Sequence, residues 1–216
     1  MFLELVDSLR CLADHEETWL VASVTGMEGR HIMRGTLGCP VCGAEYPIVD
    51  GIARFDQPDS AATELPADRS RLVEPEPEDV MRAAALLGLT EGGGVVLLGG
   101  RWSEVASPLL EIVPVHVLLV DPPGPVPLVE SISVLRTTGS IPIVAGTLRA
   151  AALDASAARP ETVTSTVKAL RARGRLVMPA SAPVPAEVVE LARDDADWVG
   201  ERTPPASPPV RLTRAR

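Results

Sequence analysis

Four side chains that commonly bind transition metals lie in the first fifth of this 216-residue chain. Cys39 and Cys42 form a Cys-x-x-Cys pair followed by a glycine, which lets the turn close so that both thiolates can reach one ion. Cys11 and His15 precede this pair at a Cys-x-x-x-His spacing that a single turn could bring to the same ion. Since a structural zinc site uses four ligands, the pattern predicts a closed structural zinc site with Cys11, His15, Cys39 and Cys42. Asp14 and a water molecule are the alternatives to His15 as the fourth ligand.

The residues between the two ligand pairs are expected to hold the site together. Residues 18–24 and 31–37 have the composition of strands, and glycines at 26 and 29 predict a turn between them. A hairpin carrying two metal-binding turns is a zinc ribbon, which we place at residues 1–55. A segment of about 55 residues has a small core and gains stability from a metal staple. The alternative is that Cys11 is a buried thiol and that Cys39 and Cys42 are a redox pair.

The second part of the chain has the pattern of a three-layer α/β protein. Proline alternates with acidic residues at 74–79, so residues 56–79 are predicted to be an extended linker before a domain at 80–216. Continuous apolar runs are typical of strands buried on both faces of a parallel sheet, and their alternation with helical segments predicts a Rossmann-like sheet. The predicted helices are 78–89, 103–113, 126–135, 160–173 and 185–193; the predicted strands are 95–98, 115–120, 141–144, 175–178 and a closing antiparallel pair at 198–202 and 210–213.

Composition and charge exclude several classes of function. Hydrophobic residues make up 46% of the chain and charged residues 23%, which are globular proportions. Twenty basic and 29 acidic residues give a net charge of −9, which argues against general nucleic-acid binding. No apolar run approaches the ~20 residues of a membrane span, and the first residues lack the basic and apolar regions of a signal peptide. We therefore expect a cytoplasmic protein without a membrane span.

The ribbon region carries a family resemblance. Leu5 to Cys11, together with the run Cys-Pro-Val-Cys-Gly-Ala-Glu-Tyr-Pro-Ile-Val-Asp-Gly-Ile at 39–52, resembles the small zinc-ribbon proteins that activate tRNA and protein methyltransferases. The similarity covers residues 3–55, about a quarter of the chain. It departs from the family at the first knuckle, where Cys-Leu-Ala-Asp-His at 11–15 replaces the usual Cys-Pro-x-Cys.

The second part resembles a class I S-adenosylmethionine-dependent methyltransferase, a domain that often follows this type of ribbon in bacteria. Gly99 and Gly100 stand where that family has its cofactor-binding glycine loop, after the first strand of the domain. Asp121 stands at the end of the next strand, where an acidic residue binds the ribose hydroxyls. The resemblance thus implies that Gly99, Gly100 and Asp121 bind the cofactor, whereas a loop acid before a proline turn is the alternative role of Asp121.

The departures from this pattern predict that the domain is degenerate. Leu97 replaces the acidic residue of the first strand, and the large side chains of Arg101 and Trp102 follow the glycines, where they could fill the pocket. Few residues remain between Asp154 and Glu161 for a fourth strand that would carry substrate-binding groups.

These observations favour a zinc-binding protein with a degenerate, non-catalytic methyltransferase-like domain. Such a protein would act as a scaffold or accessory subunit for protein partners. The first alternative is an active S-adenosylmethionine-dependent methyltransferase that uses the three cofactor residues named above. The second is a module that binds another nucleotide-like ligand.

Overall fold

The computed structural model describes residues 1–56, 75–124, 126–127 and 129–204. A short 3-10 helix and four antiparallel strands make up the first of these ranges. They are η1 (Leu3–Ser8), β1 (Val21–Glu28), β2 (His31–Gly38), β3 (Glu45–Val49) and β4 (Ile52–Arg54). The expected hairpin between the two cysteine-containing turns is present, because β1 pairs with β2 from Val21↔Gly38 to Glu28↔His31.

The later residues alternate helices and strands. They form α1 (Pro77–Leu86), β5 (Val95–Gly99), η2 (Gly100–Val105), α2 (Ala106–Ile112), β6 (His116–Val120), β7 (Ile132–Arg136), β8 (Leu148–Leu153), α3 (Pro160–Ala169), β9 (Leu170–Pro179), β10 (Val188–Arg193) and β11 (Asp197–Arg202). None of the helices in the described ranges is long and apolar enough to cross a membrane.

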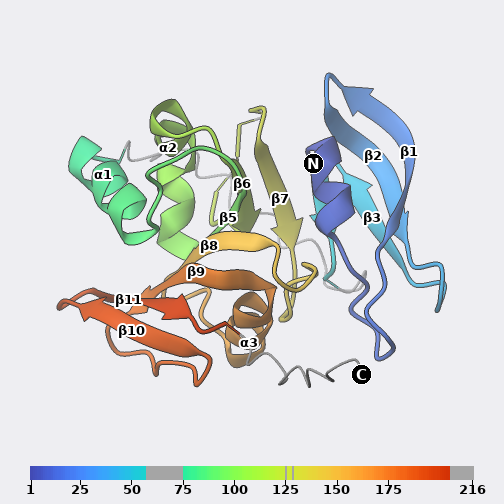
Figure 1. Cartoon of the computed structure of the whole chain (residues 1–216). Coiled ribbons are helices and arrows are strands. Elements are labelled where there is room, and N and C mark those ends of the chain that lie inside the picture. The colour runs from blue at the N-terminus through green and yellow to red at the C-terminus, as the bar shows by residue number, and fades with distance from the viewer. Residues whose placement is uncertain (57–74, 125, 128, 205–216) are drawn as a thin grey trace, which may run out of the picture.

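One sheet of 11 strands runs through the molecule in the order β1-β2-β3-β4-β7-β6-β5-β8-β9-β11-β10 (Figure 1). Strands β7, β6, β5, β8 and β9 are parallel and follow the order 3-2-1-4-5 of a doubly wound fold. Strand β11 lies antiparallel between β9 and β10. This topology confirms the predicted Rossmann-like α/β fold, and it places the switch point of the sheet between β5 and β8.

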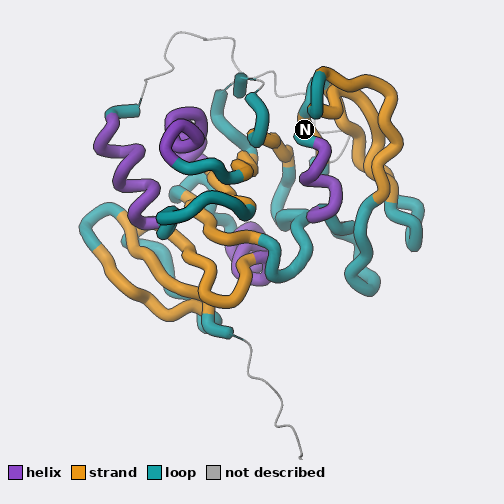
Figure 2. The backbone as a smooth tube through the Cα atoms, turned by 45° about the horizontal axis from the view of Figure 1, so that its top comes forward, coloured by secondary structure: helices purple, strands orange, loops and turns teal. Residues whose placement is uncertain are grey.

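Helices cover both faces of the parallel strands, giving three layers (Figures 1 and 2). Alternate residues of β5 divide between the two cores: Val96 and Leu98 lie in one cluster with buried residues of α1 and α2, whereas Leu97 lies in the other with residues of α3. All three side chains are fully buried. This explains why the β5 sequence is continuously apolar rather than alternating.

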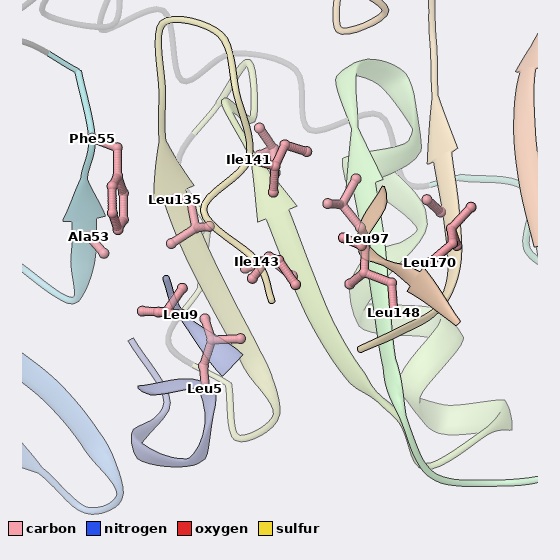
Figure 3. Close-up of a cluster of buried hydrophobic side chains, with 14 of the residues drawn as sticks. Leu5, Leu9, Ala53, Phe55, Leu97, Leu135, Ile141, Ile143, Leu148 and Leu170 are labelled. Carbon is pink, nitrogen blue, oxygen red and sulfur yellow. The ribbon is translucent and has the colours of Figure 1, made fainter. Parts of the chain in front are cut away.

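The ribbon and the α/β part share a sheet and a core. Strand β4 pairs in parallel with β7, with Ile52 opposite Val134. Leu9 and Phe55 of the ribbon belong to the same buried cluster as Ile143, and Figure 3 shows these side chains together. The division at residues 55 and 80 stays a prediction about organisation; most of the predicted linker, residues 57–74, lies outside the described part, and α1 already begins at Pro77.

Two predicted helices are strands. In the predicted helix 126–135, the β-branched run that starts at Ile132 forms β7, and the preceding prolines do not favour a helix. In the predicted helix 185–193, the segment from Val188 forms β10, which pairs with β11. Tertiary pairing overrides a helix-like spacing of apolar residues in both cases.

The structure also corrects the later strands. Helix α3 ends at Ala169 rather than near 173, and Gly174 lies inside β9. The predicted strand 141–144 forms only an isolated bridge between Ile143 and Leu9. The fourth parallel strand is β8, which was not predicted, and it ends immediately before Asp154. The predicted strand 210–213 lies outside the described residues.

Candidate functional site

The four predicted metal ligands lie together. One ligand atom from each of Cys11, His15, Cys39 and Cys42 can be chosen so that all four are within 4.8 Å of one another. Cys39 and Cys42 belong to the turn after β2, which is closed by a hydrogen bond from the Gly43 N–H to the Cys39 carbonyl oxygen at 3.0 Å. Cys11 and His15 lie on the loop between η1 and β1.

The spacing of these atoms fits a tetrahedral zinc ion. Bonds of about 2.3 Å to sulfur and 2.0–2.1 Å to nitrogen give tetrahedral edges of roughly 3.8 Å between two sulfurs and 3.5 Å between sulfur and nitrogen. The Sγ atoms of Cys11 and Cys42 are 3.7 Å apart, and Sγ of Cys39 is 3.4 Å from Nε2 of His15. Three sulfurs and one imidazole nitrogen are also a donor set that zinc prefers.

The surroundings orient the imidazole of His15 and favour the thiolate of Cys39. Nδ1 of His15 lies 2.6 Å from the backbone oxygen of Glu16, an arrangement that fixes the ring and leaves Nε2 for the cluster. That hydrogen bond is the main cause of the raised pKa of His15. Desolvation disfavours the thiolate of Cys39, but N–H groups of Cys42 and Val41 outweigh it and lower the pKa of Cys39 below that of an ordinary thiol.

Asp14, the alternative fourth ligand, does not belong to this group of atoms. Its side chain is exposed, whereas His15 is half-buried beside Cys39. The geometry therefore favours His15 over Asp14, while the coordination of a metal by these residues stays a prediction.

The second candidate site is the edge of the sheet at the carboxyl ends of the parallel strands, where doubly wound folds bind ligands in a crevice. The structure places the three predicted cofactor residues along this edge. Gly99 ends β5, Gly100 follows it with a φ of 64°, and Asp121 follows β6 with a φ of 47°. Asp154 follows β8 and lies at the same edge, on the other side of the switch point.

Side chains of the protein itself cover both glycines. A methyl group built on Gly99 would lie 2.8 Å from Leu153 Cδ2 and 2.9 Å from Ala157 Cβ. A methyl group built on Gly100 would overlap the carboxylate of Asp154. Residues 153–157 therefore pack directly against both loop glycines, and neither glycine has room for a side chain.

Asp154 is held over the loop by four hydrogen bonds. The N–H of Arg101 donates to Oδ2 at 2.8 Å, and the N–H and hydroxyl of Ser156 and the N–H of Ala157 donate to Oδ1 at 2.9, 2.6 and 3.1 Å. Desolvation works against the charged form, but these donors, led by Ser156, lower the pKa of Asp154. The carboxylate is thus fixed between the backbone after Gly100 and the turn at residues 154–157.

Asp121 is also engaged within the protein. Its Oδ1 accepts the N–H of Thr137 at 3.0 Å, and its Oδ2 pairs with Arg159 at 3.0 Å. Desolvation raises the pKa of Asp121 despite these partners. Both carboxylate oxygens connect β6 to the residues after β7 and before α3. Cofactor binding by Asp121 stays a prediction.

The two large residues after the glycines do not fill the crevice. Trp102 is buried in the core with α1 and α2. Arg101 extends across Trp102, with its guanidinium carbon 4.8 Å from the ring centroid, and its Nη2 donates to Oδ1 and Oδ2 of Asp197 at 2.6 and 2.7 Å. We expected Arg101 and Trp102 to fill the pocket beside the glycines. The side chains that contact the glycines are instead those of Leu153, Asp154 and Ala157.

Asp197 is the acceptor that holds Arg101, and we expect Asp197→Ala to destabilise the fold. Its side chain is 2% exposed and also accepts a hydrogen bond from Arg82 of α1 at 3.3 Å. Because both arginines are partly exposed, the expected loss is about 1–3 kcal/mol in the free energy of unfolding. Urea denaturation measures it, with Asp195→Ala as the control because Asp195 is an exposed neighbour. A loss below about 0.5 kcal/mol, the size of an ordinary surface substitution, would contradict this role.

A cavity of about 150 Å³ lies elsewhere, between the ribbon and the loop after β6. Its walls include Met33, Ile52, Val134 and Arg136. Neither the two crevice glycines nor Asp121 and Asp154 line it.

Comparison with known proteins does not assign the chain to a family. No family model and no curated protein matches it. Three solved structures illustrate the matches. A geranyl diphosphate methyltransferase is 14% identical over 47% of this chain and 47% of that chain, with a TM-score of 0.38. A tRNA methyltransferase from Aquifex aeolicus is 15% identical over 60% of this chain and 70% of that chain (TM-score 0.40), and a precorrin-6y C5,15-methyltransferase from Geobacter metallireducens is 11% identical over 62% of this chain and 90% of that chain (TM-score 0.41). The chain spans less than half of the first of these structures. At these scores the class of the protein, a Rossmann-like α/β protein with a Cys/His cluster, rests on its own strand order and geometry.

Sequence reasoning did not find Asp154 as the residue that covers the glycine loop. The run Asp-Ala-Ser-Ala at 154–157 has the signature of a turn in which an aspartate accepts hydrogen bonds from the following N–H groups. That signal identifies a local turn. It does not reveal that the turn lies over Gly100, more than 50 residues earlier in the chain.

Proposed function

We propose that this chain is a zinc-stabilised, non-catalytic relative of the methyltransferase fold that serves as a scaffold or accessory subunit for a protein partner. The observation that carries the proposal is the covering of both loop glycines by Leu153, Asp154 and Ala157. A cofactor would have to displace a carboxylate that already accepts four hydrogen bonds.

The other crevice residues support the same conclusion. Asp121 has both oxygens engaged by Thr137 and Arg159, so a ribose would have to share the carboxylate with these two donors. Leu97, in the position of the family's strand acid, is fully buried in the core and offers no polar group.

A role with protein partners is supported by the ribbon surface. Of the eleven exposed large hydrophobic residues in the described ranges, seven belong to residues 1–55: Leu3, Trp19, Val21, Val24, Met27, Val41 and Val49. Trp19 is 53% exposed, and tryptophan is the residue type most enriched among interface hot spots. We keep the cytoplasm as the proposed compartment, since zinc-binding thiols need reducing conditions.

Titration calorimetry with S-adenosylmethionine and S-adenosylhomocysteine tests the proposal. We expect no heat of binding at millimolar ligand and an unchanged melting temperature, because the chain's own side chains fill the crevice. Micromolar binding that weakens at least tenfold in Asp121→Ala would overturn the non-catalytic assignment. A cofactor-binding methyltransferase of known affinity, run in the same buffer, is the positive control.

The alternative of an active methyltransferase is favoured by one feature. The strand order brings Gly99, Gly100 and Asp121 to one edge of the sheet beside the switch point, which is where such a cofactor would lie. Binding in the calorimeter would move this alternative to first place.

A further inference from the structure

The loop that carries Cys11 also forms one of two seams between the ribbon and the α/β part. The N–H of Arg10 donates to the carbonyl oxygen of Pro142 at 2.9 Å, and the N–H of Val144 donates to that of Ser8 at 2.9 Å. Cys11 directly follows this pairing. Its thiol therefore belongs to the residue immediately after the first seam.

Tyr46 connects the metal cluster to the second seam. Its hydroxyl lies 3.4 Å from Sγ of Cys11 and accepts the N–H of Leu12 at 3.3 Å. Its ring packs on Phe55, with the ring centroids 4.5 Å apart. Phe55 is buried, and its N–H donates to the carbonyl oxygen of Arg136, the last residue of β7, at 2.7 Å.

These contacts give the Tyr46 hydroxyl a defined direction. The hydroxyl oxygen already accepts from Leu12, and a metal-bound thiolate at Cys11 can only accept. The hydroxyl hydrogen of Tyr46 is then donated to Cys11. Hydrogen bonds of this kind from outside the ligand set orient a ligand, and their loss commonly weakens metal binding by about 10–100-fold.

We propose that Tyr46 is the positioning residue through which metal binding at the Cys/His cluster fixes the ribbon against the α/β sheet. The inference rests on the zinc site of the proposed function. Fixing Cys11 orders residues 8–10 against 142–144, and fixing the Tyr46 ring orders Phe55 against β7. Loss of the metal should then loosen both seams while the centre of the parallel sheet stays ordered.

The variant Tyr46→Phe tests this coupling, because it removes the hydroxyl and keeps the ring that packs on Phe55. Competition with a chromophoric chelator should show zinc binding weakened about tenfold or more. Hydrogen exchange followed by mass spectrometry should show at least tenfold faster exchange at Arg10, Phe55 and Val144 when zinc is removed from the wild type. The amides that join β5 to β6 should keep their protection.

A matched control removes a hydroxyl far from the cluster. Thr164 is exposed on α3, where its hydroxyl donates to the carbonyl oxygen of Pro160, and Thr164→Ala should change neither zinc affinity nor exchange at the seams. Equal zinc affinity in Tyr46→Phe and wild type would overturn the coupling alone. Seam amides indifferent to zinc removal would overturn both the coupling and the structural role of the metal. A wild-type chain that binds no zinc would instead overturn the metal site of the proposed function.

Discussion

Replacing Cys39 by serine is expected to abolish stoichiometric zinc binding and to unfold residues 1–55 at 25 °C. Serine is a poor zinc ligand, and three remaining donors cannot close a tetrahedral structural site. Structural zinc in finger-type sites contributes about 10–16 kcal/mol of apparent folding free energy. The net stability of a whole domain is only about 5–15 kcal/mol. Zinc content by mass spectrometry of the metal, together with the NMR spectrum of the ribbon residues, measures the loss.

Two comparisons make this result specific. Val41 lies between the two knuckle cysteines and is 65% exposed, so Val41→Ser should keep both zinc and fold. His15→Ala should weaken zinc binding strongly, whereas Asp14→Ala should leave it unchanged, because only His15 belongs to the cluster. A Cys39→Ser chain with a native spectrum and no bound metal would contradict the structural role of the site.

The ribbon could be predicted from the sequence because its information is local. The Cys-x-x-Cys turn and the hairpin between 21 and 38 each depend on residues close in the chain. The choice between His15 and Asp14 needed the backbone: hydrogen bonds from Cys11 to Thr18 and from His15 to Ala13 fold this loop. The fusion of the ribbon to the large sheet through β4 was not predictable, since a three-residue strand carries almost no sequence signal.

In the α/β part, the strength of the apolar pattern decided which strands could be predicted. The runs that form β5 and β6 are continuous and rich in valine and leucine, so they could be recognised as buried strands. Strand β8 is Leu-Arg-Ala-Ala-Ala-Leu, which favours a helix by composition and is a strand only because β5 and β9 flank it. The glycine loop could also be recognised locally, because Gly99 and Gly100 directly follow the apolar run of β5. The packing of residues 153–157 over this loop is a tertiary contact that the spacing of residues does not reveal.

Gly100→Ala is the substitution that tests this covering most directly, and we expect it to cost about 3–8 kcal/mol in the free energy of unfolding. An alanine in the left-handed region costs about 1–2 kcal/mol. The new methyl group would also overlap the carboxylate of Asp154 and force it away from its donors. Overpacking and lost hydrogen bonds each contribute about 1–3 kcal/mol. Urea denaturation followed by circular dichroism gives the value.

Gly146→Ala is the matched control, because Gly146 has a φ of 76° and nothing within 4 Å of the added methyl group. Gly146→Ala should lower the free energy of unfolding by only about 1–2 kcal/mol, the cost of holding an alanine in the left-handed backbone conformation. In an Asp154→Gly background, Gly100→Ala should fall to the same value, since the overlapping carboxylate is gone. The difference between the two backgrounds is the coupling energy of the covered loop. If Gly100→Ala and Gly146→Ala cost the same in the wild-type background, Asp154 does not lie over the loop in solution, the crevice is open to a ligand, and the non-catalytic assignment loses its main support.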